Sequence, residues 1–394
     1  MRLFTDPARR HARGRSSSLG VRPAALFTSA LLVAGVAGCS TGSSPGSSPE
    51  SAPPAASTSA PAVKVAGTVV STAGSTNEME AVVPDPIKAD WTTLGSKGNG
   101  VELVQVGGDG TTYDKQADLT GDAGAKIEAL TNDINGLDAE APGRSALAGL
   151  NKITSPANSP VWVFSPLLDT VKPLDFSDLA FDESPNTVVK AVTKAKRLPK
   201  LKGRNVTFVV TPVAGEQKKL SALQVGYQRA VWEGLAKAGG AKKVTFFEGT
   251  GTTPSAGTIA AVPIPDPNDA FNSQKEGKKT TCTLPSPALF VADQAALIDK
   301  KATLKALQKC LDTVDGSTTI TVEGHTSGYS TSNNEFTKSL SVRRATEVAA
   351  LLRELKVPAK NITNVTGYGS SKPLVKPSSN PKNRAVVVTF TSTS

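Results

Sequence analysis

The chain has 394 residues, of which 38 % are apolar and 20 % charged, so it can bury the cores of two ordinary domains. Its formal net charge is +10, but half of that excess lies before residue 39, where six arginines stand against one aspartate. No segment combines dense lysine and arginine with aromatic side chains suited to base stacking, and we therefore expect no nucleic-acid partner.

Residues 1–39 have the layout of an export signal. An arginine-rich start precedes the mostly apolar residues 24–38, a run too short to be a secure membrane-spanning helix. The sequence VAGC, from Val36 to Cys39, then resembles the lipobox of bacterial lipoproteins. The resemblance implies cleavage before Cys39 and attachment of acyl chains to it, which would anchor the chain firmly. A plain secretory signal with an incidental cysteine is the alternative.

Residues 40–63 are almost entirely serine, proline, alanine, glycine and threonine. Such a segment cannot bury enough apolar area to fold, and we expect a disordered linker. As a flexible coil it would span roughly 25–30 Å, enough to hold the folded part away from a membrane surface.

Between residues 64 and 250, strand-like and helix-like runs alternate. Apolar, β-branched runs predict strands at 65–72, 101–108, 160–166, 203–212 and 242–249. Helical patterns lie at 121–134, 144–153, 186–198 and 216–240. This alternation predicts an α/β domain over residues 64–250 with a doubly wound, mainly parallel sheet.

The turn after the first predicted strand, VVSTAGSTNEME, resembles the metal-site turn D-x-S-x-S of von Willebrand factor A-like domains. Its positions hold Ser71, Ala73 and Ser75, so the aspartate and one serine are absent. Ser145 and Ser165 are the nearest counterparts of the family's other metal-site positions. Because hard cations such as Mg²⁺ favour carboxylate oxygens, we expect no metal here. A generic doubly wound domain is the alternative to this resemblance.

Motifs for cofactors and catalysis are missing from the first domain. The stretch GSKGNG, Gly95 to Gly100, lacks the flanking strand and helix of a dinucleotide fingerprint, and no Walker-type G-K-[ST] sequence occurs. We therefore expect no cofactor and no enzymatic activity. A hydrolase without a recognisable motif in the first domain is the rival hypothesis.

Residues 251–283 are rich in glycine, proline and threonine and are predicted to form a loop linker. Beyond them, residues 284–394 show strand patterns at 288–293, 318–324, 361–369 and 384–390, and helix patterns at 294–311 and 337–355. This β-α-β-α-β-β order predicts a smaller α+β domain with a mixed sheet. Cys282 and Cys310 are the only cysteines after Cys39, and in an exported chain we expect a disulfide between them.

Motifs in this last region resemble the OmpA-like C-terminal domain, a peptidoglycan-binding module. The pieces ITVEGHTS, LSVRRATEVAALLRELKVP, ITNVTGYGSSKPLV and NPKNRAVVV occur in the family's order. In that family, an aspartate after G-H-T and a helical arginine hold the diaminopimelate of the wall's stem peptide. This ligand is zwitterionic, so a carboxylate can meet its ammonium while a guanidinium meets its carboxylate.

The resemblance assigns wall-binding roles to Ser327, Thr337, Arg344, Asn383 and Arg384. Arg344 stands in the place of the family's arginine, but Ser327 replaces its aspartate and Thr337 its asparagine. Losing the charged partner of a desolvated ammonium costs about 1.5–3 kcal/mol, so we expect weak binding. The alternative is a retained fold whose site has decayed, in an adaptor that binds other envelope proteins.

His325 precedes Thr326 in the same turn, and no G-x-S-x-G elbow accompanies it. We expect its ring to hydrogen-bond within the turn and not to act in catalysis. The sequence as a whole predicts a cell-envelope lipoprotein, anchored through Cys39 on the extracytoplasmic side of a membrane, whose C-terminal domain binds peptidoglycan.

Overall fold

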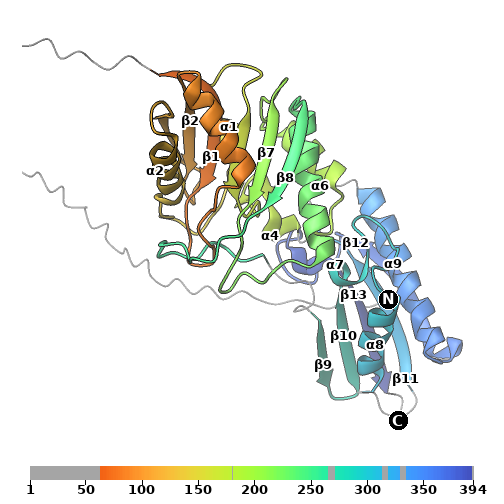
Figure 1. Cartoon of the computed structure of the whole chain (residues 1–394). Coiled ribbons are helices and arrows are strands. Elements are labelled where there is room, and N and C mark those ends of the chain that lie inside the picture. The colour runs from red at the N-terminus through yellow and green to blue at the C-terminus, as the bar shows by residue number, and fades with distance from the viewer. Residues whose placement is uncertain (1–62, 180, 265–270, 313–317, 329–333, 393–394) are drawn as a thin grey trace, which may run out of the picture. The chain divides into compact units, whose positions relative to one another are not determined.

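The computed structural model describes residues 63–179, 181–264, 271–312, 318–328 and 334–392. Residues 60–394 form one compact unit, which contains two large sheets (Figure 1). Cys39 and the predicted signal and linker up to residue 62 lie outside the described residues. Over the described ranges, every helix is too short or too polar to cross a membrane.

The first sheet has six strands in the order β3-β2-β1-β4-β7-β8. Their bounds are β1 Lys64–Thr72, β2 Asn99–Val106, β3 Thr112–Asp118, β4 Val161–Ser165, β7 Asn205–Val210 and β8 Lys243–Glu248. All neighbours are parallel except β2 and β3. The prediction of a mainly parallel sheet is confirmed. The edge strand β3 was not predicted, because its sequence TYDKQAD is polar and mostly exposed.

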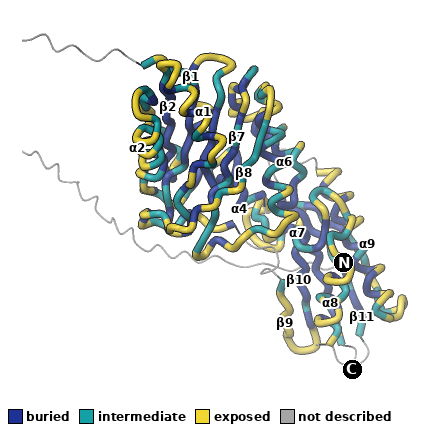
Figure 2. The backbone as a smooth tube through the Cα atoms, in the orientation of Figure 1, coloured by how far each residue is buried: buried dark blue, intermediate teal, exposed yellow. Residues whose placement is uncertain are grey.

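Helices cover both faces of this sheet, because successive strand residues point to opposite sides. Val69 and Trp162 pack with helices α1 (Asp85–Ser96) and α2 (Ala123–Asn135). Val70 and Val163 pack on the other side, with α3 (Ala146–Leu150), α5 (Pro185–Lys194) and α6 (Ala222–Ala238). Figure 2 shows the resulting contrast between buried strands and the partly exposed helix α2.

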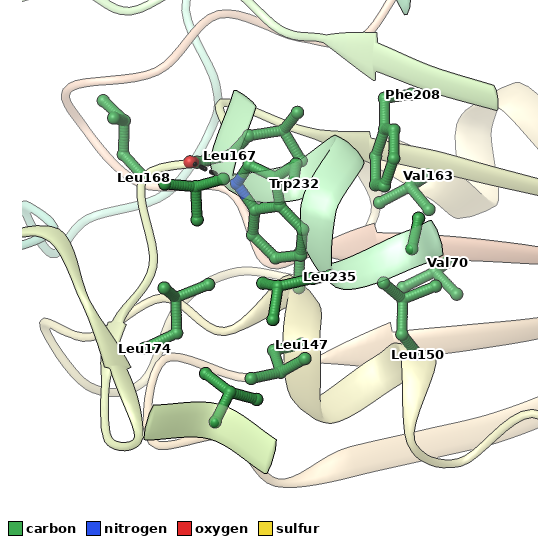
Figure 3. Close-up of a cluster of buried hydrophobic side chains, with 14 of the residues drawn as sticks. Val70, Leu147, Leu150, Val163, Leu167, Leu168, Leu174, Phe208, Trp232 and Leu235 are labelled. Atoms are coloured by element: carbon green, nitrogen blue, oxygen red, sulfur yellow. Dashed lines mark hydrogen bonds between the residues drawn. The ribbon is translucent and has the colours of Figure 1, made fainter. Parts of the chain in front are cut away.

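The loop that follows β4 is tied to helix α6 (Figure 3). Trp232 donates its indole N–H to the carbonyl oxygen of Leu167 over 2.8 Å, and Gln228 donates to the carbonyl oxygen of Pro166 over 2.7 Å. Leu167 itself has a φ of 56°, in the left-handed region that side chains other than glycine rarely adopt. The loop is therefore fixed at the end of the sheet where β1 and β4 also end.

The second sheet has five strands in the order β12-β11-β13-β10-β9. Their bounds are β9 Asn272–Glu276, β10 Lys279–Pro285, β11 Thr318–His325, β12 Ile362–Gly369 and β13 Ala385–Ser392. Only β11 and β12 pair in parallel. Helices α8 (Lys300–Leu311) and α9 (Asn334–Glu354) contribute Leu307, Val348 and Leu352 to the core of this sheet.

Two predictions for this region are wrong. The expected strand at 288–293 is replaced by helix α7 (Ser286–Leu289) and a loop. The first strands of the sheet instead lie in the expected linker, where β9 and β10 form a hairpin, so the expected boundary at residue 284 falls inside β10. In β10, Thr280, Cys282 and Leu284 are buried and alternate with less buried residues, a pattern that its threonine and lysine content disguises.

Cys282 of β10 and Cys310 of α8 form the predicted disulfide, with their Cα atoms 6.2 Å apart. The remaining elements are short. They are β5 Thr170–Val171, β6 Leu174–Asp175, α4 Phe176–Leu179 and the 3₁₀ turns η2 Ala359–Asn361 and η3 Pro381–Asn383.

Candidate functional site

The turn between β11 and α9 begins with three buried polar residues, His325, Thr326 and Ser327. Strand β11 approaches α9 closely here, since a Cβ atom on Gly324 would lie 2.0 Å from the carbonyl oxygen of Ser341. Among the described residues, the hydroxyl groups of Thr326 and Ser327 have no hydrogen-bond partner. An unpaired buried hydroxyl costs about 1–3 kcal/mol, so these groups are available to a ligand.

His325 makes a contact other than the predicted one. Its Nδ1 lies 2.9 Å from the carbonyl oxygen of Lys372, in the loop after β12 and outside its own turn. Burial lowers the pKa of His325, and the bond to Lys372 opposes that shift only in part. A buried imidazole held this way orients two loops and is typical of a structural histidine.

Arg344 of α9 is fully buried and forms an ion pair with Asp182, which lies between α4 and α5. The guanidinium binds both carboxylate oxygens, with Nη2 2.7 Å from Oδ1 and Nη1 3.1 Å from Oδ2. Its Nε donates to the carbonyl oxygen of Gln294 over 2.8 Å, and its Cζ lies 5.2 Å from the ring centre of Phe290. The arginine predicted to meet a ligand thus already holds a carboxylate of its own chain.

Arg384, which directly precedes β13, also contacts Asp182 and residues near it in sequence. Its Nη1 donates to the carbonyl oxygen of Leu179 over 2.9 Å, and its Nε lies 3.8 Å from Oδ2 of Asp182. Its Nη2 lies 3.6 Å from Oε1 of Glu183 and has no hydrogen-bond partner in the described part of the chain. Arg384 is therefore only partly satisfied by these contacts.

The two other predicted residues mainly shape the backbone. Asn383 accepts a hydrogen bond from the N–H of Val375 and donates to the carbonyl oxygens of Val375, Pro377 and Ser378. Thr337 donates to the carbonyl oxygen of Asn334, in the first turn of α9, over 3.0 Å.

Ser327, Thr337 and Arg384 line one cavity of about 270 Å³. Three acidic residues that the sequence did not place there, Asp182, Glu183 and Asp293, line the same cavity. Burial raises the pKa of Glu183 to about 7, an effect that the neighbouring Asp293 and Asp182 reinforce and the two arginines oppose. The cavity therefore gathers hydroxyl groups, carboxyl groups and a guanidinium, a set that suits a ligand carrying both charges.

Asp182 and Glu183 were missed because they lie far away in sequence; Asp182 precedes Arg344 by 162 residues. The signal that could have indicated them is the acidic pair itself. The pair follows the apolar residue Phe181 and directly precedes the helix that begins at Pro185. An acidic pair at such a place ordinarily belongs to a solvent-facing loop.

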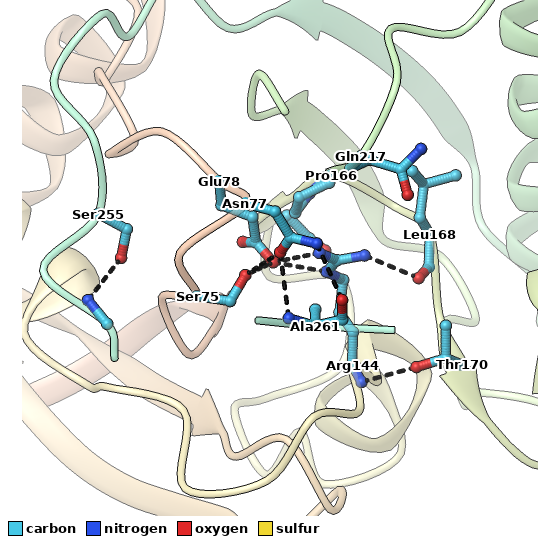
Figure 4. Close-up of polar contacts among 12 residues, drawn as sticks. Ser75, Asn77, Glu78, Arg144, Pro166, Leu168, Thr170, Gln217, Ser255 and Ala261 are labelled. Carbon is cyan, nitrogen blue, oxygen red and sulfur yellow. Dashed lines mark hydrogen bonds and ion pairs between the residues drawn. The ribbon is translucent and has the colours of Figure 1, made fainter. Parts of the chain in front are cut away.

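A second buried polar cluster lies after β1, where the loops of β1 and β4 meet (Figure 4). Glu78 and Arg144 form an ion pair there, and both side chains are at most 5 % exposed. Ser75 donates to Oε1 of Glu78 over 2.8 Å, and Arg144 also donates to the carbonyl oxygen of Leu168 over 3.1 Å. Asn77 joins the cluster to the carbonyl oxygen of Ala261 over 2.8 Å.

The serines compared with metal ligands have other roles in this cluster. Ser145 caps α3 by accepting the N–H of Ala148, and Ser165 accepts the N–H of Leu167. Ser71 is buried without a hydrogen-bond partner among the described residues, and Ala73 supplies no side-chain ligand. In the described ranges no three histidine, cysteine or acidic side chains gather as a metal site would require.

Asp169 is the remaining buried acid of this region. It accepts the N–H groups of Ala146 and Leu147, each over 2.9 Å. Burial raises its pKa to about 7 in spite of these bonds and the nearby Arg144. The carboxyl group thus holds the first turn of α3 beside the Glu78–Arg144 pair.

Comparisons with known proteins place the C-terminal region in a family. Residues 289–386 match the OmpA family. The outer-membrane lipoprotein YfiB of Pseudomonas aeruginosa is 41 % identical over 76 residues, which are 19 % of this chain and 43 % of that protein. The chain thus spans less than half the length of this curated relative.

Solved structures give more distant likenesses. The periplasmic domain of Helicobacter pylori MotB is 19 % identical with a TM-score of 0.27, over 31 % of this chain and 89 % of that one. The cell wall anchor of the T6SS from Pseudomonas aeruginosa is 22 % identical with a TM-score of 0.28, over 32 % of this chain and 90 % of that one.

Proposed function

Because residues 289–386 form an OmpA-family domain, we propose that this protein is a cell-envelope lipoprotein whose C-terminal domain binds peptidoglycan non-covalently. The recognised group is the diaminopimelate of the stem peptide, whose ammonium and carboxylate suit a site with both charges.

The observation that carries the proposal is the convergence of the motif residues. Ser327, Thr337 and Arg384, which lie in three separate segments, line one cavity, and Arg344 is bonded to another residue of its wall. The hydroxyl of Ser327 and Nη2 of Arg384, which have no hydrogen-bond partner within the described ranges, offer a donor or acceptor to each end of an amino acid.

Binding is weak in this proposal because Ser327 stands where the family carries its aspartate. A hydroxyl group can accept a hydrogen bond from an ammonium but contributes no charge. The loss is about 1.5–3 kcal/mol, or roughly ten- to a hundredfold in affinity.

The anchor in this proposal is the lipid-modified Cys39, followed by the spacer of residues 40–63. The curated relative is an outer-membrane lipoprotein, which supports an envelope location on the extracytoplasmic side of a membrane.

The first domain is a non-catalytic, von Willebrand factor A-like module in this proposal, and envelope proteins are its expected partners. Counted in chain order, the strands of its sheet follow the order 3-2-1-4-5-6 of a doubly wound fold, with an antiparallel edge strand. In such folds ligands bind where the strand order reverses, here between β1 and β4. The Glu78–Arg144 pair occupies that place, which supports a site without a metal.

The test is co-sedimentation of residues 40–394 with purified cell-wall sacculi. We expect saturable pelleting that free diaminopimelate competes away, and pelleting at roughly tenfold or more lower protein concentration for Ser327→Asp, which restores the charge. Asp90→Asn, on the exposed side of α1, is the charge-change control. If neither the native chain nor Ser327→Asp pellets with sacculi, the wall-binding proposal is wrong.

An envelope adaptor with a decayed wall site is the second candidate. The observation in its favour is that Arg344 is fully buried and that all three of its guanidinium nitrogens already donate to Asp182 or Gln294. Pelleting by Ser327→Asp but not by the native chain would favour this candidate.

A further inference from the structure

The acidic segment Phe181–Glu183 occupies the place where the C-terminal domain would take up a ligand's carboxylate. A guanidinium binds one carboxylate bidentately through two parallel N–H groups. In Arg344 the two terminal nitrogens bind the two oxygens of Asp182 over 2.7 and 3.1 Å. The other edge that could take a carboxylate bidentately, Nε with Nη2, is already engaged by the carbonyl oxygen of Gln294 at Nε, so Asp182 and an external carboxylate compete for the same edge of the guanidinium.

Burial makes this exclusion complete. The side chain of Arg344 is 0 % exposed and that of Asp182 is 5 % exposed. The face that Asp182 does not cover is closed by Gln294, which accepts from Nε, and by the ring of Phe290. A wall peptide can therefore reach the guanidinium only after Asp182 has moved away.

The segment is held by contacts that can be released singly. Oδ2 of Asp293 accepts the N–H of Ser184 over 2.8 Å and the hydroxyl of Thr187 over 3.2 Å, and the N–H of Asp293 donates to the carbonyl oxygen of Asp182. Phe181 has a φ of 59°, a conformation that costs a bulky residue about 1–2 kcal/mol. Packing against Phe176 and Tyr227 offsets that strain.

The same arrangement gives a reason for Ser327. The cavity that Ser327 lines already contains Asp182, Glu183 and Asp293. An aspartate at position 327 would add a fourth carboxyl group to this cavity, and like charges at short range raise the free energy of the closed arrangement. Serine at position 327 adds no charge and is therefore compatible with the three carboxyl groups of this cavity.

We propose that Asp182 is an internal ligand of the Arg344 site, which a wall stem peptide must displace in order to bind. The inference rests on the proposed function for the identity of the external ligand, while the covering of Arg344 by Asp182 can be tested separately. The free energy by which the contact with Arg344 holds Asp182 in place is then also the free energy that peptide binding must overcome.

The first experiment compares residues 40–394 with the variant Asp182→Asn in sacculus co-sedimentation. The asparagine keeps the shape of the side chain but loses its charge, so we expect pelleting at roughly tenfold or more lower protein concentration. Asp293→Ala, which frees the segment without stripping Arg344 of its partner, is the second variant in case Asp182→Asn folds poorly. Asp90→Asn is the control and should pellet as the native chain does.

A second readout does not depend on the wall. An arginine-selective dicarbonyl reagent, followed by peptide mass spectrometry, should leave Arg344 unmodified in the native chain and modify it in Asp182→Asn or Asp293→Ala. Increased modification without pelleting by any version would support the covering of Arg344 and overturn the wall as the ligand. Unchanged modification and unchanged pelleting in both variants would overturn the inference, whether or not the native chain binds the wall.

Discussion

Two buried arginines, Arg144 and Arg344, each hold a carboxylate that lies far away in sequence. Taking both charges out of water is costly, so such a pair fixes geometry more than it adds stability. Glu78 pairs with Arg144 at the place where doubly wound sheets bind ligands, and Asp182 pairs with Arg344 at the place proposed for the wall peptide. In the proposed function, an internal salt bridge thus occupies the position of an external group at both places.

The Glu78–Arg144 pair gives the first prediction. Glu78→Ala leaves the Arg144 guanidinium buried without its counter-charge and should destabilise the first sheet domain by about 3–5 kcal/mol. Glu78→Leu combined with Arg144→Met removes both charges and should cost clearly less than Glu78→Ala alone. Urea unfolding followed by tryptophan fluorescence measures both, since all three tryptophans (Trp91, Trp162 and Trp232) are buried in this domain. A double variant that loses as much stability as Glu78→Ala, or more, would contradict the predicted coupling.

Asp169 gives a prediction about pH. Its folded pKa, about 7, lies above the ordinary value of 3.8, so the folded chain binds the extra proton between these values. Unfolding free energy should therefore fall as pH rises from about 4 to 7, by about 4 kcal/mol for this group. Glu183, whose pKa is also raised to about 7, adds to the slope.

The variant Asp169→Asn tests this assignment. It removes the titrating group, while Arg144 and Asp175, the charged groups that act on it, stay in place. Its unfolding free energy, measured by urea titration at several pH values, should depend less steeply on pH than that of the native chain. If the unfolding free energy of Asp169→Asn depends on pH as steeply as that of the native chain, groups other than Asp169 cause the dependence.

At the scale of elements, the disulfide joins strand β10 to helix α8 across the core of the second sheet. It closes a segment with a sequence separation of 28 residues, for which the chain-entropy estimate is about 3–4 kcal/mol. The double variant Cys282→Ala/Cys310→Ala should lower the unfolding temperature of the chain, as followed by far-ultraviolet circular dichroism. Reductant should lower it in the native chain but leave the double variant unaffected.

Elements with a strong pattern were predictable, and those with a weak pattern were not. The runs that became β1, β4 and β7 are apolar and β-branched, and their hydrophobic period decides the structure. Strands β3 and β9 are edge strands with polar, mostly exposed residues. They are strands because they pair with a neighbouring strand, and their own sequences carry no signal of that pairing.

The candidate site was predictable only in its local half. The turn that holds Ser327 and the helix that holds Arg344 lie close in sequence, and both elements follow from local patterns. Asp182 and Glu183 come from the other sheet domain, and no local pattern pairs a carboxylate with an arginine so far along the chain. The wall-binding role predicted for Arg344 did not include this contact with Asp182.

At the scale of the whole molecule, the ion pairs of Asp182 and Glu183 with Arg344 and Arg384 couple two sheets that each have their own core. Residues buried together unfold together when breaking their contact exposes unpaired charge, since a buried charge without a partner is costly. Loss of either sheet would leave such charges on the other, so the two sheets should unfold in one concerted step.

The variant Asp182→Asn should separate that step into two. Tryptophan fluorescence reports the first sheet alone, whereas far-ultraviolet circular dichroism reports both. We expect coincident thermal transitions by the two probes in the native chain and in the control Asp90→Asn, and distinct transitions in Asp182→Asn. Coincident transitions in Asp182→Asn would mean that apolar contacts couple the sheets. The charged segment would then be free to leave Arg344 without loosening the rest of the molecule.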